Sequence, residues 1–333
     1  MCDAIEKMYQ LELSMKNSLI AGNQDIDAFN ESYNAAYSNL LAANKNLNLK
    51  YDYGFALFST VKIPLNILRN SSANATNGQI QSFDRNKVNS FFLNEFDIDI
   101  SAVDVIEVPN MPDHAEAFAM ECGVNDHYIA IATTKFLSYD LLIHEFAHTV
   151  EFTERRKNNT PAQILNFPTL SETIAHYYQM VYMLKYSTEN ERLGMLATIT
   201  EAYLFYHCIQ IMMKVAPNER TFNREKIYKA EEFKQFLIAY DGTYVISNFF
   251  DRYDNQNYFS IYNSVHARRL GAFLALNFIK YKLDITELFH TRYPTGNTIS
   301  LKGLIEQTKL KPKVLFNFNK MEETITKFIS GAL

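Results

Sequence analysis

The sequence predicts an α+β fold that is mostly helical and contains one small mixed sheet. The chain holds only 10 Gly and 8 Pro against 21 Tyr and 25 Phe, so few residues interrupt long helices packed through aromatic side chains. Short runs with strand character gather between residues 55 and 133. Beyond residue 160, apolar residues follow helical spacing almost throughout.

The composition is that of a folded protein with a sizeable core. The chain has 333 residues, of which 47% are hydrophobic. Its formal net charge of -5 arises from 32 basic and 37 acidic residues that are interleaved, so a nucleic-acid partner is not expected. Three scattered cysteines, Cys2, Cys122 and Cys208, are too few for a disulfide framework or a thiolate metal site, which favours a reducing compartment.

Neither a secretory signal nor a membrane span is predicted. Residues 1–6 lack the basic start and the apolar core of a signal, so we expect a cytoplasmic protein, with leaderless export into another cell as the alternative. The most apolar helical stretch, 196–216, contains Glu201, His207 and Gln210, which a lipid-facing helix rarely carries. The sequence does not indicate an oligomeric state.

The N-terminal region is predicted to be helical. Apolar residues recur near helical spacing in residues 4–19 and again in 29–41, and we treat residues 1–54 as an accessory helical segment. From residue 55 the period changes to two, which predicts a strand over 55–63 that ends at Pro64.

A sheet and a helix that backs onto it are predicted within residues 55–160. A helix over 85–96 leads to a strand over 103–108. Two further apolar runs, 115–122 and 128–133, are separated by Gly123-Val124-Asn125-Asp126 and read as a hairpin. A helix that carries the motif described next follows directly.

The remaining chain, residues 161–333, is predicted to form a helical lobe. The expected helices cover residues 169–187, 189–215, 225–240, 258–282 and 300–331.

The run His144-Glu145-Phe146-Ala147-His148 has the spacing of a zinc site. Residues four apart share one face of a helix, so the two histidines can present their imidazoles to one ion, with Glu145 beside the bound water. Catalytic zinc keeps three protein ligands and one open position, where it lowers the pKa of its water. We therefore expect one zinc ion per chain and Glu145 as the general base. The alternative is an ordinary helix face that carries these side chains without a metal.

A third ligand is expected from a second helix. The candidate stretch Ser171-Glu172-Thr173-Ile174-Ala175-His176 begins 23 residues after the second histidine of the motif, and we favour Glu172 as the ligand. His176, one turn later, is the alternative; Glu172 would then complete a capping box with Thr169. Glu151 is a further candidate near the metal, although such a residue is more often solvated.

These motifs resemble the gluzincin clan of zinc peptidases. Thermolysin-like members carry an Asn-Glu-x-x-Ser-Asp pattern on the second helix, in which Glu172 falls on the ligand position. His176 falls where those enzymes have an aspartate that supports a zinc-bound histidine. The resemblance implies a zincin-like fold, with 115–122 as the edge strand that receives the substrate by backbone pairing, and with the helical lobe 161–333 carrying the third ligand.

Gluzincins also use a Tyr or His from the later chain to hydrogen-bond the oxyanion of the reaction. The tyrosine-rich stretch 251–262 resembles the corresponding segment of thimet-oligopeptidase-like enzymes, which share the His-Glu-Phe-small-His run. By that resemblance Tyr262 and Tyr258 are the candidate catalytic donors, and Tyr253 and His266 are further candidates.

The predicted function is zinc-dependent hydrolysis of peptide bonds, in a peptide or protein substrate, by an endopeptidase or an oligopeptidase. One alternative is a leaderless toxin or effector protease with a single protein substrate, in which the N-terminal helices serve as a recognition module. Another is a non-catalytic peptide-binding relative, against which the intact Glu145 argues.

Overall fold

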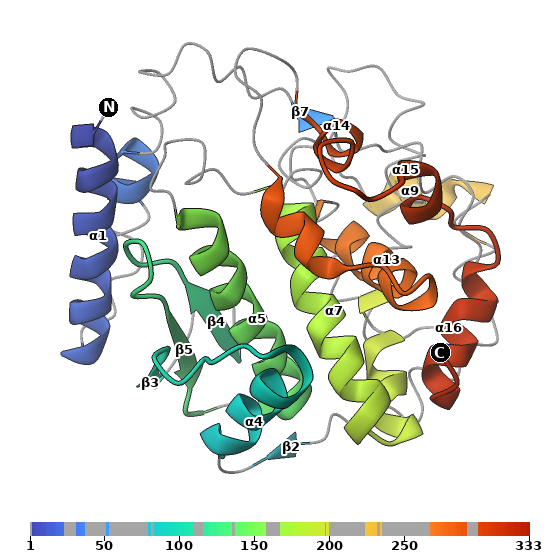
Figure 1. Ribbon diagram of the computed structural model, residues 1–333, viewed down its shortest axis with the longest axis horizontal. Coiled ribbons are helices and arrows are strands. Elements are labelled where there is room, and N and C mark those ends of the chain that lie inside the picture. Colours follow the sequence, from blue (N-terminus) through green and yellow to red (C-terminus); the bar gives the residue numbers. More distant parts are fainter. Residues whose placement is uncertain are drawn as a thin grey trace. The chain divides into compact units, whose positions relative to one another are not determined.

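The observed fold is α+β and mostly helical with a small mixed sheet, which confirms the predicted fold class (Figure 1). The chain divides into two units, each assembled from three segments: Met1–Gly54, Gly78–Phe167 and Asp284–Pro312 form unit 1, and Phe55–Asn77, Pro168–Leu283 and Lys313–Leu333 form unit 2. The computed structural model describes residues 2–22, 31–36, 51–52, 79–80, 83–109, 116–134, 137–157, 167–196, 198–199, 224–231, 234, 267–291 and 299–333.

Helix α1 (Cys2–Ile20) of unit 1 confirms the first predicted helix. Its buried residues Met15 and Leu19 join a cluster with Ile106, Val108 and Tyr128 of the sheet. Of the second predicted helix, residues 31–36 are helical, and the remainder of 29–41 lies outside the described residues. Within the described residues, none of the helices combines the length and apolar character that crossing a bilayer requires.

The three-stranded sheet of unit 1 has the order β3-β5-β4. β3 (Asp104–Val108) pairs parallel to β5 (Tyr128–Ala132), and β4 (Ala117–Met120) pairs antiparallel to β5. All five residues of β5 are buried, as expected for the central strand. The turn between β4 and β5 requires a left-handed residue, and Gly123 supplies it with φ 55°. The predicted hairpin is confirmed, and in the part of the chain that the structure describes β4 has the predicted edge position.

Two further strand pairs in unit 1 were not predicted. β1 (Tyr51–Asp52) pairs parallel to β7 (Ile299–Ser300), and β2 (Gln79–Ile80) pairs antiparallel to β6 (Leu137–Ser138). Each strand has two residues, too few for an alternating pattern to be recognised in the sequence. The strand predicted over 55–63 lies outside the described residues.

Two further helices of unit 1 were predicted and are observed. Helix α4 (Arg85–Phe96) is capped by Asp84, whose side chain accepts a hydrogen bond from the N–H of Asn86. Helix α5 (Tyr139–Arg156) carries the motif and contacts β4 and β5, so the sheet backs it as expected. The 3-10 helix η5 (Ile285–His290) also contacts α5.

Unit 2 is helical in its described parts. Helix α7 (Pro168–Tyr186) confirms the prediction for 169–187, and α13 (Ala267–Lys280) lies beside it (Figure 1). Residues 189–196 are helical, and α9 (Arg224–Lys229) covers the start of another predicted helix. Most of the remaining residues of the helices predicted over 189–215, 225–240 and 258–282 lie outside the described residues.

The single helix predicted over 300–331 is wrong. The segment forms three short helices instead: α14 (Leu301–Ile305), α15 (Pro312–Leu315) and α16 (Met321–Ser330). Pro312 has no N–H to donate to a preceding turn, so a helix cannot run through it. Lys320, immediately before α16, adopts the left-handed conformation with φ 57°, so a right-handed helix is interrupted there a second time.

Candidate metal centre

The motif residues lie in the middle of α5, where the helix is buried on most of its surface. Ser138 caps the helix, and its side chain accepts a hydrogen bond of 3.4 Å from the N–H of Leu141. Ile143, Phe146 and Ala147 are fully buried and anchor the helix in the core. His144 and Glu145 are also buried, at 9% and 8% exposure, although both are polar. Polar groups at such depth need hydrogen-bonding or metal partners.

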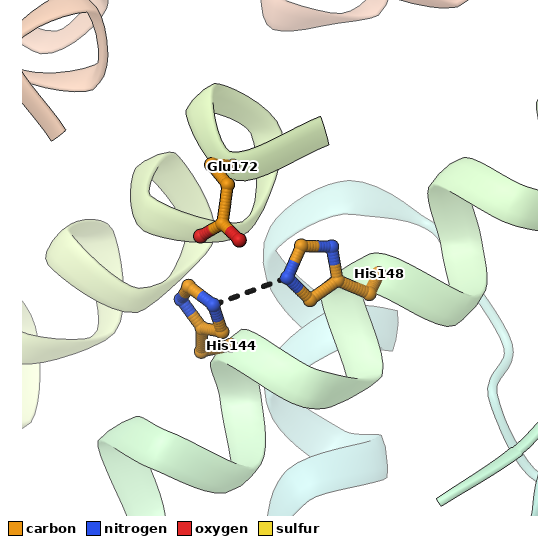
Figure 2. Close-up of side chains that lie close together, drawn as sticks. All are labelled: His144, His148 and Glu172. Carbon is orange, nitrogen blue, oxygen red and sulfur yellow. Dashed lines mark hydrogen bonds between the residues drawn. The ribbon is translucent and has the colours of Figure 1, made fainter. Parts of the chain in front are cut away.

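The two histidines approach each other through the same ring nitrogen. Nε2 of His144 lies 3.1 Å from Nε2 of His148, and the ring planes make an angle of 82° (Figure 2). Two nitrogens bound to one tetrahedral zinc at about 2.0–2.1 Å would stand ~3.3 Å apart. The observed separation therefore suits two imidazole ligands on a single ion.

Glu172 completes a group with metal-binding spacing. One ligand atom each from His144, His148 and Glu172 lies within 4.8 Å of the others. The carboxylate of Glu172, on α7, points toward the two imidazoles (Figure 2). Two imidazoles and one carboxylate are a donor set that catalytic zinc accepts, so the residues present fit the ion. Within the described residues no second group of this kind was found.

His176 lies next to the group and is not a member of it. Its Nε2 is 3.7 Å from Oε2 of Glu172, one turn earlier on α7, and its Nδ1 is 3.0 Å from Oε1 of Gln179. The arrangement favours Glu172 as the ligand, with His176 as a neighbour that Gln179 holds in place.

The capping-box alternative for Glu172 is wrong. Helix α7 begins at Pro168, so Thr169 is already inside the helix. Proline is well suited to the first helical position because its missing N–H costs nothing there. The hydroxyl of Thr169 is buried and has no hydrogen-bond partner among the described residues, whereas a cap would accept from the backbone.

Glu151 is not solvated, and it is not a member of the metal-binding group. Its exposure is 6%, and its carboxylate accepts a hydrogen bond of 2.7 Å from Nε of Arg155. Arg155 also pairs with Glu121 at 2.6 Å. Glu151 therefore belongs to a chain of ion pairs at the C-terminal end of α5.

Glu145 is held by the edge strand. Its Oε2 accepts a hydrogen bond of 2.7 Å from the backbone N–H of Ala119 in β4. The N–H of Ala132 donates to the carbonyl of Glu116, which makes these two residues a hydrogen-bonded pair. Such pairs alternate along an antiparallel ladder, so Phe118 and Met120 also turn their backbone groups toward β5. Ala117 and Ala119 consequently turn their backbone N–H and C=O groups away from β5. The edge of β4 that pairs with no other strand among the described residues therefore lies beside the carboxylate of Glu145.

A buried ion cluster at the end of α5 was not predicted from the sequence. Arg156 is fully buried and donates to both carboxylate oxygens of Glu12 on α1, at 2.8 and 2.9 Å, and also pairs with Glu121. Burial alone would raise the pKa of Glu121, but the charges of Arg155 and Arg156 lower it to about 2. Glu12 and Arg156 are 144 positions apart in the sequence, so no local pattern predicts that they form a pair.

An aromatic stack connects the motif to the β4–β5 turn. The ring of His148 stacks on Phe152 with centroids 5.9 Å apart, and the rings of Phe152 and His127 make a T-shaped contact with centroids 5.5 Å apart. Burial, together with the charge of Arg156, lowers the pKa of His127 to about 3. His127 is thus neutral near pH 7, which allows its Nδ1 to accept the N–H of Cys122 at 2.9 Å. The stack supports one face of the second histidine of the motif.

The candidate oxyanion donors Tyr262 and Tyr258, and the further candidates Tyr253 and His266, lie outside the described residues. They stay predictions.

No family model, curated protein or solved structure matches the chain. The resemblance to gluzincins therefore rests on the motif residues alone, and the function has to be argued from the chemistry of the site.

Proposed function

We propose that the protein is a zinc-dependent peptidase in which His144, His148 and Glu172 bind the metal and Glu145 is the general base. The observation that carries the proposal is the convergence of two imidazole nitrogens and one carboxylate within 4.8 Å, with a buried carboxylate directly after the first histidine. Bound zinc would supply an acidified water and polarise the carbonyl of the substrate.

Glu145 moves the proton in this proposal. It takes a proton from the attacking water and passes it to the leaving amine. The hydrogen bond from the N–H of Ala119 to Oε2 fixes the orientation of the carboxylate. Because an N–H group can only donate, it suits the ionised carboxylate, which only accepts and is the form a base requires.

The edge of β4 supports a peptide as the substrate. The N–H and C=O of Ala117 and the C=O of Ala119 point away from β5, as derived above from the register. An extended chain can add to such an edge through backbone hydrogen bonds, largely without regard to its side chains. A substrate strand bound there would bring its backbone close to Glu145. Tyr262 and Tyr258 remain our candidates for hydrogen-bonding the oxyanion.

The zinc content of the purified protein tests the proposal. Elemental mass spectrometry should find about one zinc per chain in the wild type. The metal should be lost in His148→Ala and strongly reduced in Glu172→Ala. In His176→Ala it should be retained with weaker affinity, because His176 neighbours Glu172 without binding the metal. Absence of zinc from the wild type, even after zinc is supplied, would reject the proposal.

A peptide-library digest then tests the substrate class. An oligopeptidase should cleave short peptides and spare folded proteins and long chains, whereas an endopeptidase should cleave long chains as well. Failure to cleave any library member by a zinc-loaded protein would favour the effector alternative with one protein substrate.

A further inference from the structure

Helix α13 approaches α7 most closely at the turn that carries Glu172. A Cβ atom placed on Gly271 would lie 2.7 Å from the Cβ of Glu172, 2.8 Å from its carbonyl carbon and 2.8 Å from the N of Thr173. Carbon atoms attract at about 3.5–4.0 Å and repel steeply below that range. Two of these three contacts are to the backbone of α7, which cannot move aside by changing a rotamer.

The packing around this turn leaves little room for α7 to move away from α13. Thr173 is fully buried, and its hydroxyl donates to the carbonyl of Thr169 at 2.6 Å. Further along the same pair of helices, Tyr177 contacts Phe278 with ring centroids 6.2 Å apart. The two helices are thus in contact at two levels, so a push at Gly271 would shift the first turns of α7.

We propose that Gly271 is a positioning residue for the metal centre. Its lack of a side chain lets α13 set the position of the α7 turn from which Glu172 reaches the metal. Gly271 itself touches neither metal nor substrate. This inference rests on the proposed function, because it assigns Glu172 as the third ligand.

Gly271→Ala is the smallest substitution that tests this role, because it adds only one methyl group at the contact. Gly271 lies within a helix and outside the left-handed region, so alanine suits its backbone and favours the helix. The expected result is a zinc affinity lowered on the order of tenfold to a hundredfold, since displaced supporting residues cost that much at other metal sites. Competition with a chelating dye measures the affinity directly, without any assay of hydrolysis.

A double-mutant cycle separates positioning from general damage. Glu172→Ala removes the ligand and keeps the Cβ atom with which residue 271 collides. If Gly271 acts through the third ligand, Gly271→Ala should change the residual zinc affinity little in the Glu172→Ala background. An equal loss in both backgrounds would show a merely structural role and overturn the inference.

A matched control adds bulk elsewhere on the same helix. Ala275 is fully buried on α13, one turn after Gly271. Ala275→Val should lower the stability and leave the zinc affinity of the folded protein unchanged. An osmolyte such as sucrose keeps weakened variants folded during the titrations.

The outcomes for the two proposals differ. Zinc binding that depends on Glu172 but is unaffected by Gly271→Ala would overturn the positioning role and leave the proposed function standing. No zinc binding by the wild type would overturn the proposed function, and the positioning role with it.

Discussion

The backbone N–H of Ala119 donates a hydrogen bond of 2.7 Å to Oε2 of Glu145, so the edge strand and the proposed general base are joined directly. In the proposed function, the outward backbone groups of the same strand bind the extended substrate chain. The proposed function thus assigns both substrate binding and orientation of the base to one strand, and the two roles can be separated by experiment.

Ala119→Pro should lower peptide hydrolysis about tenfold or more and leave the zinc content unchanged. Proline removes the N–H that orients Glu145, and a hydrogen bond to a charged group contributes about 1.5–3 kcal/mol. The N–H of residue 119 points away from β5, so no ladder bond is lost, and proline is tolerated at such edge positions. Steady-state kinetics and elemental analysis of the same preparation measure both quantities.

Phe118→Pro is the matched control for this experiment. The N–H of residue 118 faces β5, so proline there breaks the ladder. This variant should unfold at a lower urea concentration than Ala119→Pro. If both variants lost the same stability, the assignment of inward and outward residues in β4 would be incorrect.

Glu145→Gln should retain about one zinc per chain and lose hydrolysis by at least the 10²–10⁴-fold that general acid-base catalysis typically contributes. The amide oxygen of glutamine can still accept the hydrogen bond from Ala119, so the local structure is kept. It cannot take a proton from water at neutral pH. Hydrolysis at a rate close to that of the wild type would exclude Glu145 as the base.

Local patterns predicted the elements that carry the site. Apolar periodicity predicted helices over 85–96 and 169–187, and α4 and α7 begin within one residue of those bounds; the motif helix α5 follows β5 closely, as expected. The histidine pair followed from helical geometry alone. The choice of Glu172 over His176 needed the structure, because both lie on the same helix at a suitable distance in the sequence.

Other features depend on tertiary contacts that no local pattern encodes. The C-terminal segment has apolar spacing throughout, and only Pro312 and the left-handed Lys320 show where it is interrupted. The close approach of Gly271 to Glu172 joins helices about a hundred residues apart in the sequence, a separation over which periodicity carries no information. The ion pair of Glu12 and Arg156 could not be predicted either, because the two residues are far apart in the sequence.

Arg156→Met should destabilise the protein by about 3–5 kcal/mol, because it leaves Glu12 buried at 2% exposure without its partner. Urea denaturation measures the loss. The neighbouring Lys157 provides the control, since its pair with Glu154 is 58% and 33% exposed. Lys157→Ala should therefore change the stability by less than about 1 kcal/mol. The double variant Glu12→Met with Arg156→Met should recover part of the loss, because no unpaired charge remains in that pair.

Glu121 should make the stability depend on pH in the acid range. Arg155 and Arg156 outweigh the opposing effect of burial and lower the pKa of Glu121 in the folded protein to about 2. The ordinary pKa of glutamate is 4.5, so folding favours the ionised form. The contribution is fully present above the unfolded value and is lost as the pH falls through about 2.

Glu121→Gln tests this dependence. The difference in unfolding free energy between wild type and Glu121→Gln should be largest above about pH 5, on the order of 3 kcal/mol from a lowering of the pKa from 4.5 to about 2. It should shrink steadily as the pH is lowered toward 2, because the wild-type carboxylate then becomes protonated and loses its attraction to the two arginines. Urea titrations of both proteins between pH 7 and pH 3 measure the difference. A difference that stays constant over this range would mean that the arginines do not hold Glu121 in its ionised form, and that the ion cluster at the end of α5 is stabilised by packing instead.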